Sequence, residues 1–148
     1  LAVNIQKSMG GGPMKIMMGY YDVSLDSRIV RTALDRAKRL NAQLHLVTSM
    51  TIGEGVPKNE FDMAEGNLRK GRKFFCDQGV DCAAHLFETV LTEGEGLVKF
   101  AMDNQMDELI VGVRSLSKLG KLIFGSTAQY VILNASCPVL SVNEQDHP

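Results

Sequence analysis

The chain alternates between short apolar runs and longer segments in which apolar residues recur every three to four positions. The short runs are predicted to be five strands, at residues 15–21, 42–50, 80–88, 108–113 and 138–142. The longer segments are predicted to be four helices, at residues 25–40, 59–77, around 97–102 and 126–135. Strands that alternate with helices predict an α/β fold, in which a doubly wound parallel sheet of five strands carries helices on both faces.

The helix boundaries are predicted from residues that cap helix N-termini and from glycines. The first helix has the clearest stripe, formed by Ile29, Val30, Ala33, Leu34, Ala37 and Leu40. Ser24 precedes it and is of a residue type that caps helix N-termini. In the second helix, Gly66 and Gly71 each lower helix propensity by about 1 kcal/mol relative to Ala. Gly79 is well placed to end that helix.

The alternating pattern predicts one domain over residues 14–143, which suits a chain of 148 residues. Residues 1–13 end in a Gly-Gly-Gly-Pro segment and are expected to be a flexible tail or a cloning remnant. Residues 144–148 are expected to form a short C-terminal tail.

Composition narrows the classes of function. A net charge of -1 does not favour nucleic acid or an anionic membrane as a partner. No apolar run approaches the roughly 18 residues that a membrane span needs. The three cysteines form no CxxC pair, which argues against a disulfide framework and indicates a reducing, cytoplasmic location. The three histidines lie far from one another along the chain, so zinc is not expected.

Polar residues at two strand ends mark the expected binding site. Open α/β sheets bind ligands at the carboxyl ends of their strands, where the strand order reverses. If the order is 3-2-1-4-5, as the fold class suggests, the ends of the first and fourth strands flank this point. Asp22 follows the first strand, and Arg114 and Ser115 follow the fourth.

The segment over residues 112–127 has the chemistry of a phosphate site. It holds three cations and then Gly125, Ser126 and Thr127 at the start of a helix. A helix N-terminus offers unpaired N–H groups and a partial positive charge, and glycine lets a ligand approach the backbone closely. The alternative is an ordinary capped helix after a loop.

The spacing within this segment resembles the universal stress protein family. Nucleotide-binding members carry a glycine, two residues, a second glycine, nine residues, and then glycine followed by serine or threonine. Gly112, Ser115, Gly125 and Ser126 reproduce that spacing, with Ser115 in place of the second glycine. Residues 107–112 and 137–140 are similar to the fourth and last strands of the family, and Asp22 follows the first strand as an aspartate does there.

The resemblance implies roles for individual residues. Asp22 and Val47 would lie near the adenosine end of a nucleotide. The ribose and phosphates would be lined by Gly112, Ser115, Gly125, Ser126 and Thr127. Arg114, Lys118 and Lys121 either compensate electrostatically for the missing glycine or are ordinary solvated cations of a loop. Two further alternatives stay open: Val47 as a core strand residue, and Asp22 as the cap of the first helix.

The expected function is an adenine-nucleotide-binding module in stress response or signalling. The resemblance implies ATP or AMP, with or without Mg²⁺, and a homodimer formed through the last strand. The alternative is a dimeric interaction protein with a vestigial pocket. At most slow ATP hydrolysis is expected, because no general base is evident and the P-loop, GxGxxG and GxSxG patterns are absent from their expected places.

Overall fold

The computed structural model describes residues 11–113 and 125–144 of the chain. It confirms the predicted alternation of strands and helices. The elements, in chain order, are β1 Lys15–Gly19, α2 Arg28–Arg39, β2 Gln43–Thr51, α3 Lys58–Asp77, β3 Cys82–Thr89, α4 Glu93–Asp103, β4 Glu108–Val113, α5 Ser126–Asn134 and β5 Val139–Asn143.

The five strands form one parallel sheet in the order β3-β2-β1-β4-β5, which confirms the predicted order. β1 is the central strand, and it pairs Gly19 with Val47 of β2 and Ile16 with Glu108 of β4. The chain therefore reverses direction across the sheet between β1 and β4. This reversal opens a crevice at the carboxyl ends of these two strands.

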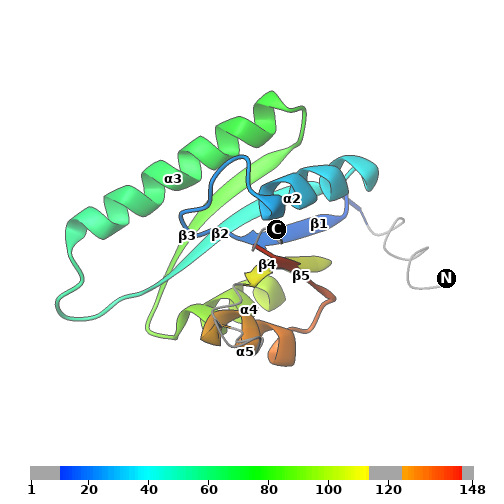
Figure 1. The fold of residues 1–148 in the computed structure, drawn as a ribbon. Helices are drawn as coiled ribbons and strands as arrows, with labels where there is room; N and C mark the ends of the chain where they lie inside the picture. Colours follow the sequence, from blue (N-terminus) through cyan, green and yellow to red (C-terminus); the bar gives the residue numbers. More distant parts are fainter. Residues whose placement is uncertain (1–10, 114–124, 145–148) are drawn as a thin grey trace, which may run out of the picture.

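Helices cover both faces of the sheet. α2 and α3 lie on one face, and α4 and α5 lie on the other (Figure 1). Side chains of β1 alternate between the two layers: Ile16 and Met18 join the α2–α3 core, whereas Met17 joins the α4–α5 core. All three are fully buried, as expected of a strand that is covered on both faces.

The start of α2 differs from the prediction. The helix begins at Arg28, and its N-cap is Ser27, whose side chain makes no capping hydrogen bond. The expected cap, Ser24, instead donates its hydroxyl to Asp26. The backbone N–H of Ser27 donates to the carbonyl of Ser24 at 3.0 Å, so a turn occupies the residues that were expected to begin the helix.

Two further expectations can be compared with the described residues. Cys76, Cys82 and Cys137 form no disulfide in the part of the chain that the structure describes. None of the helices in residues 11–113 and 125–144 is both long and apolar enough to cross a membrane.

Candidate functional site

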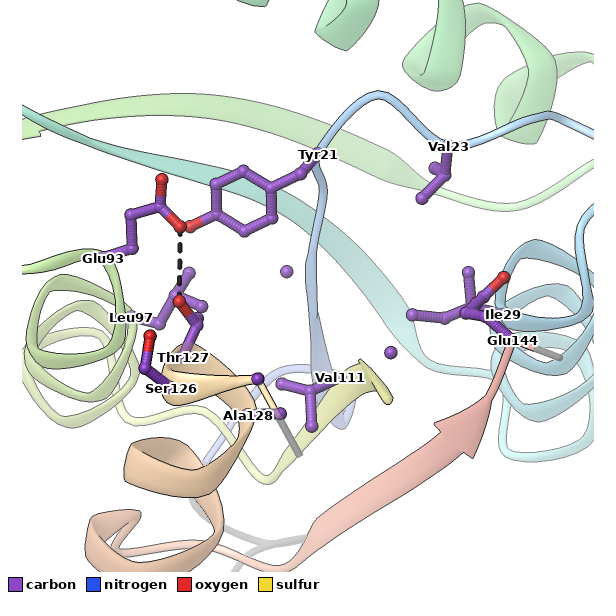
Figure 2. Close-up of a pocket in the computed structure, with 13 residues that line it drawn as sticks. Tyr21, Val23, Ile29, Glu93, Leu97, Val111, Ser126, Thr127, Ala128 and Glu144 are labelled. Atoms are coloured by element: carbon purple, nitrogen blue, oxygen red, sulfur yellow. Dashed lines mark hydrogen bonds between the residues drawn. The ribbon is translucent and has the colours of Figure 1, made fainter. Parts of the chain in front are cut away.

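A cavity of about 400 Å³ lies where β1 and β4 end. This volume falls in the range of small-molecule sites. The cavity is bounded by the β1 and β4 ends, by α2, by the first turns of α4 and α5, and by the end of β5 (Figure 2). Its lining residues are Gly19, Tyr21, Val23, Ile29, Glu93, Leu97, Val111, Gly112, Gly125, Ser126, Thr127, Ala128 and Glu144.

The first turn of α5 presents hydrogen-bond donors to the cavity. Gly125 is the N-cap of α5, so Ser126 and Thr127 are its first two helical residues, and their N–H groups are among those without a partner inside the helix. Ser126 is therefore not the N-cap of α5. The partial positive charge of this terminus suits an anion.

Neither the backbone conformation nor the packing of the described residues requires glycine at position 125. Its φ is -59°, which any residue can adopt, and a Cβ built there would meet no heavy atom within 4 Å. Gly112 is different, because its Cβ would lie 3.3 Å from Cγ of Glu144. The space in front of Gly125 is open to a ligand that approaches the backbone.

Glu93 brings a carboxylate to the same helix terminus. It is the first residue of α4, which begins with a capping box formed by Thr92 and Glu95. Thr127 Oγ1 donates to Glu93 Oε2 at 3.3 Å, and this bond joins the first turns of α4 and α5 (Figure 2). Glu93 thus lies where the α5 terminus favours negative charge.

Tyr21 forms a wall of the cavity. Its hydroxyl accepts a hydrogen bond from the backbone N–H of Ser49 at 3.2 Å, which holds the ring in place. Burial raises the pKa of Tyr21 well above its usual value, so the phenol is neutral at physiological pH. Tyr21 also lines a second, smaller hollow of about 250 Å³, which contains Asp22.

The structure gathers some of the predicted residues and separates others. Gly112, Gly125, Ser126 and Thr127 share the larger cavity. Asp22 lies in the second hollow with φ of 27°, and because α2 begins at Arg28, its alternative role as the cap of that helix is wrong.

Val47 lines neither hollow. Its side chain is fully buried in the α4–α5 core, in agreement with the alternative that it is a core strand residue. Arg114 and Ser115 lie outside the described residues, as do Lys118 and Lys121.

Among the cavity residues that the sequence analysis did not predict, three carry an acidic or phenolic side chain: Tyr21, Glu93 and Glu144. Glu144 had been assigned to the C-terminal tail, but its N–H donates to the carbonyl of Val113 at 3.1 Å and continues the pairing of β5 with β4. A signal was available, because residues that follow neighbouring parallel strands meet at one edge of the sheet. Tyr21, which follows β1, offered the same signal, whereas Glu93 offered none, because helix packing brings it to the cavity.

The sequence matches the family model described as the universal stress protein family over residues 14–143. The chain belongs to this family. A curated universal stress protein from Mycolicibacterium smegmatis is 30% identical over 128 residues, which cover 86% of this chain and 95% of that protein.

Solved structures of the family have the same fold. A universal stress protein from Archaeoglobus fulgidus is 28% identical, with a TM-score of 0.79 over 86% of this chain and 97% of that one. Another structure of an Archaeoglobus fulgidus universal stress protein, in complex with dAMP, is 23% identical, with a TM-score of 0.73 over 86% of this chain and 96% of that one.

Proposed function

We propose that this protein binds an adenine nucleotide in the cavity between β1 and β4. The observation that carries the proposal is the open space at Gly125 among the described residues, at a helix N-terminus that lines a cavity of suitable size. The dAMP complex of the Archaeoglobus fulgidus relative supports an adenine nucleotide as the ligand.

The proposed ligand is ATP or AMP, with or without Mg²⁺, and its ends are recognised by different residues. The phosphates lie against Gly125, Ser126 and Thr127. The ribose lies near Gly112. Asp22 lies toward the adenosine end, in the hollow that shares Tyr21 with the cavity. Helix donors favour the charged end of the nucleotide, while the apolar wall of Leu97 and Val111 favours its uncharged part.

The proposed assembly is a homodimer that acts in the cytoplasm in stress response or signalling. β5 is the last strand of the sheet and pairs only with β4 within the described residues. Beside it, α5 exposes Ile132 and Leu133, which are 41% and 73% exposed. Pairing with a second copy across a two-fold axis would satisfy the strand edge and cover these apolar side chains.

One observation favours the alternative, a dimeric interaction protein that binds no nucleotide. Glu93 already places a carboxylate beside the first turn of α5 and accepts a hydrogen bond from Thr127. An internal anion at this position competes with phosphate for the same donors. Nucleotide binding therefore requires Glu93 to release Thr127 or to share the terminus through a cation.

Thermal unfolding with ATP, ADP and AMP tests the proposal. A ligand at 100 times its Kd stabilises a protein by about 2.7 kcal/mol, which raises the melting temperature of a domain of this size by about 5–10 °C. Native mass spectrometry then identifies the bound mass, with and without Mg²⁺. No shift with any of the three nucleotides at millimolar concentration would support the non-binding alternative.

A further inference from the structure

Glu144 stands at the edge of the cavity nearest Gly112. It follows directly after β5, and it lines the cavity beside Ile29, on the opposite side from Glu93 (Figure 2). A Cβ built on Gly112 would lie 3.3 Å from Cγ and 3.4 Å from Oε1 of Glu144. The carboxylate therefore lies close to the backbone of Gly112.

One oxygen of this carboxylate is buried and lacks a hydrogen-bond partner. Oε1 of Glu144 is shielded from solvent, and no group in the part of the chain that the structure describes donates to it. An ionised carboxylate only accepts hydrogen bonds, and burying an acceptor without a donor is unfavourable. Binding would be favoured for a ligand that donates a hydrogen bond to Oε1, because that bond would satisfy the buried acceptor.

The phosphate end of a nucleotide does not supply a hydrogen-bond donor for Oε1 of Glu144. Phosphate oxygens are acceptors and carry the same charge as the carboxylate, so they are repelled by Glu144. Their place is the first turn of α5, where N–H donors are available. The vicinal hydroxyls of ribose are donors, are uncharged, and lie next to the phosphate in a nucleotide.

We propose that Glu144 accepts hydrogen bonds from the ribose hydroxyls of the bound nucleotide and makes the site selective for ribonucleotides over deoxyribonucleotides. This inference rests on the proposed function and extends it with a specificity-determining residue. The two sides of the cavity then have opposite roles: the α5 terminus binds the anionic phosphate, and Glu144 binds the hydroxyls. Acidic side chains recognise ribose hydroxyls in the same chemical way in dinucleotide-binding folds.

Calorimetric titration of AMP, 2′-deoxy-AMP and 3′-deoxy-AMP tests the inference on the whole chain. The unmodified protein is expected to bind AMP about 10–100 times more tightly than the deoxy ligand that lacks the contacted hydroxyl, as for a hydrogen bond to a charged group. Glu144→Met, which removes both acceptors at similar length, is expected to bind all three with nearly equal Kd. Glu144→Gln keeps one neutral acceptor and is expected to keep part of the preference.

Glu93→Gln is the matched control, because it removes the other carboxylate of the cavity. It is expected to change the affinity for all three ligands by the same factor and to leave the ribose preference intact. Titrations in EDTA separate a direct contact from one made through Mg²⁺: a preference that disappears without the cation would overturn the direct contact.

The outcomes separate the two proposals. Equal binding of the three ligands by the unmodified protein, or an unchanged preference in Glu144→Met, would overturn the role of Glu144 and leave nucleotide binding intact. Should Glu144→Met fail to fold, an unchanged preference in Glu144→Gln would overturn the role in its place. Failure of the unmodified protein to bind any of the three would overturn the proposed function, and this inference with it.

Discussion

At the scale of single residues, two glycines of the cavity differ in how closely other side chains pack against them. Gly112 lies beneath Glu144, where a side chain would be crowded. Gly125 faces open space with an ordinary backbone conformation. A larger residue at Gly125 should therefore leave the fold unharmed while it fills the space in front of the α5 terminus.

Replacing Gly125 by Val is expected to weaken ATP binding by about 1–3 kcal/mol, the usual effect of spoiling a buried polar contact. The melting temperature without ligand should change little, because a Cβ at position 125 meets no atom of the described residues within 4 Å. Calorimetry with ATP and adenosine measures the effect, and adenosine, which has no phosphate, should be nearly unaffected.

Gly53→Val is the matched control for Gly125→Val. Gly53 also has no atom within 4 Å of a built Cβ and lies in the loop after β2, away from the cavity. Equal losses of ATP and adenosine in Gly125→Val would contradict a phosphate contact, as would parent-like ATP binding.

A second residue-scale feature is a histidine pair on the α4 face of β2 and β3. His45 Nδ1 and His85 Nε2 lie 3.0 Å apart, and His45 Nε2 lies 2.8 Å from the Gln43 side-chain oxygen. Burial lowers the pKa of both imidazoles. The charges of His85 and Lys15 lower that of His45 further, while Asp81 opposes them. The pair therefore disfavours protonation in the folded state.

This pair predicts a loss of stability in mild acid. Both histidines take up protons more readily in the unfolded chain, so stability is full above a pH of about 6.5 and falls as the pH drops below it. The loss levels off below the lowered pKa of the folded state. Urea unfolding between pH 7.5 and 5 measures it, and His85→Gln should show a shallower dependence. An identical pH dependence in the variant would show that other groups cause it.

At the scale of an element, α3 contains two glycines that look alike in the sequence and differ in the structure. A Cβ on Gly66 would meet no atom within 4 Å. A Cβ on Gly71 would lie 2.7 Å from Cζ and Oη of Tyr20 and 3.0 Å from Leu46 Cδ1. Gly71 allows α3 to approach β2 closely, whereas Gly66 only lowers helix propensity.

The two alanine substitutions are therefore expected to have opposite signs. Gly66→Ala should raise the free energy of unfolding by about 0.5–1 kcal/mol, because alanine favours the helix. Gly71→Ala should lower it by about 1–3 kcal/mol, since the buried Tyr20 ring would have to move. Each variant controls for the other in urea unfolding, and a change of the same sign in both would contradict the packing explanation.

At the scale of the whole molecule, the sheet order decides which surfaces remain for a partner. β3 and β5 are the two edge strands of the described sheet. The α5 helix, which packs against β4 and β5, leaves Ile132 and Leu133 exposed. The second edge has no comparable apolar helix face, because α3 packs against β3 and exposes mainly polar residues.

The proposed homodimer predicts that Leu133→Glu produces a monomer. A charge in the centre of an apolar interface is unfavourable because it loses its hydration. Light scattering at micromolar concentration should give twice the chain mass for the parent and one chain mass for Leu133→Glu. Met63→Glu, at a 62% exposed position on α3, is the control and should remain dimeric. A parent mass of one chain would contradict the assembly.

The sequence by itself determined the element types, the parallel sheet and the strand order that its family implies. Apolar periodicity reports local burial, and each strand and helix is long enough to carry that signal. The donor segment Gly125-Ser126-Thr127 was also predictable, because a helix start and a glycine motif lie within one stretch of chain.

Only the tertiary structure decided which side chains meet in the cavity. Glu93, Glu144 and Tyr21 come from three elements far apart in the chain, and Asp22 lies in a neighbouring hollow although it follows the same strand as Tyr21. The start of α2 at Arg28, with Ser27 rather than Ser24 as its N-cap, depended on a turn that competes with the helix. The physical reason is the same in each case. The sequence pattern reflects the burial and secondary-structure propensity of each segment, whereas the cavity is formed by the way in which the packed helices and strands bring their ends together.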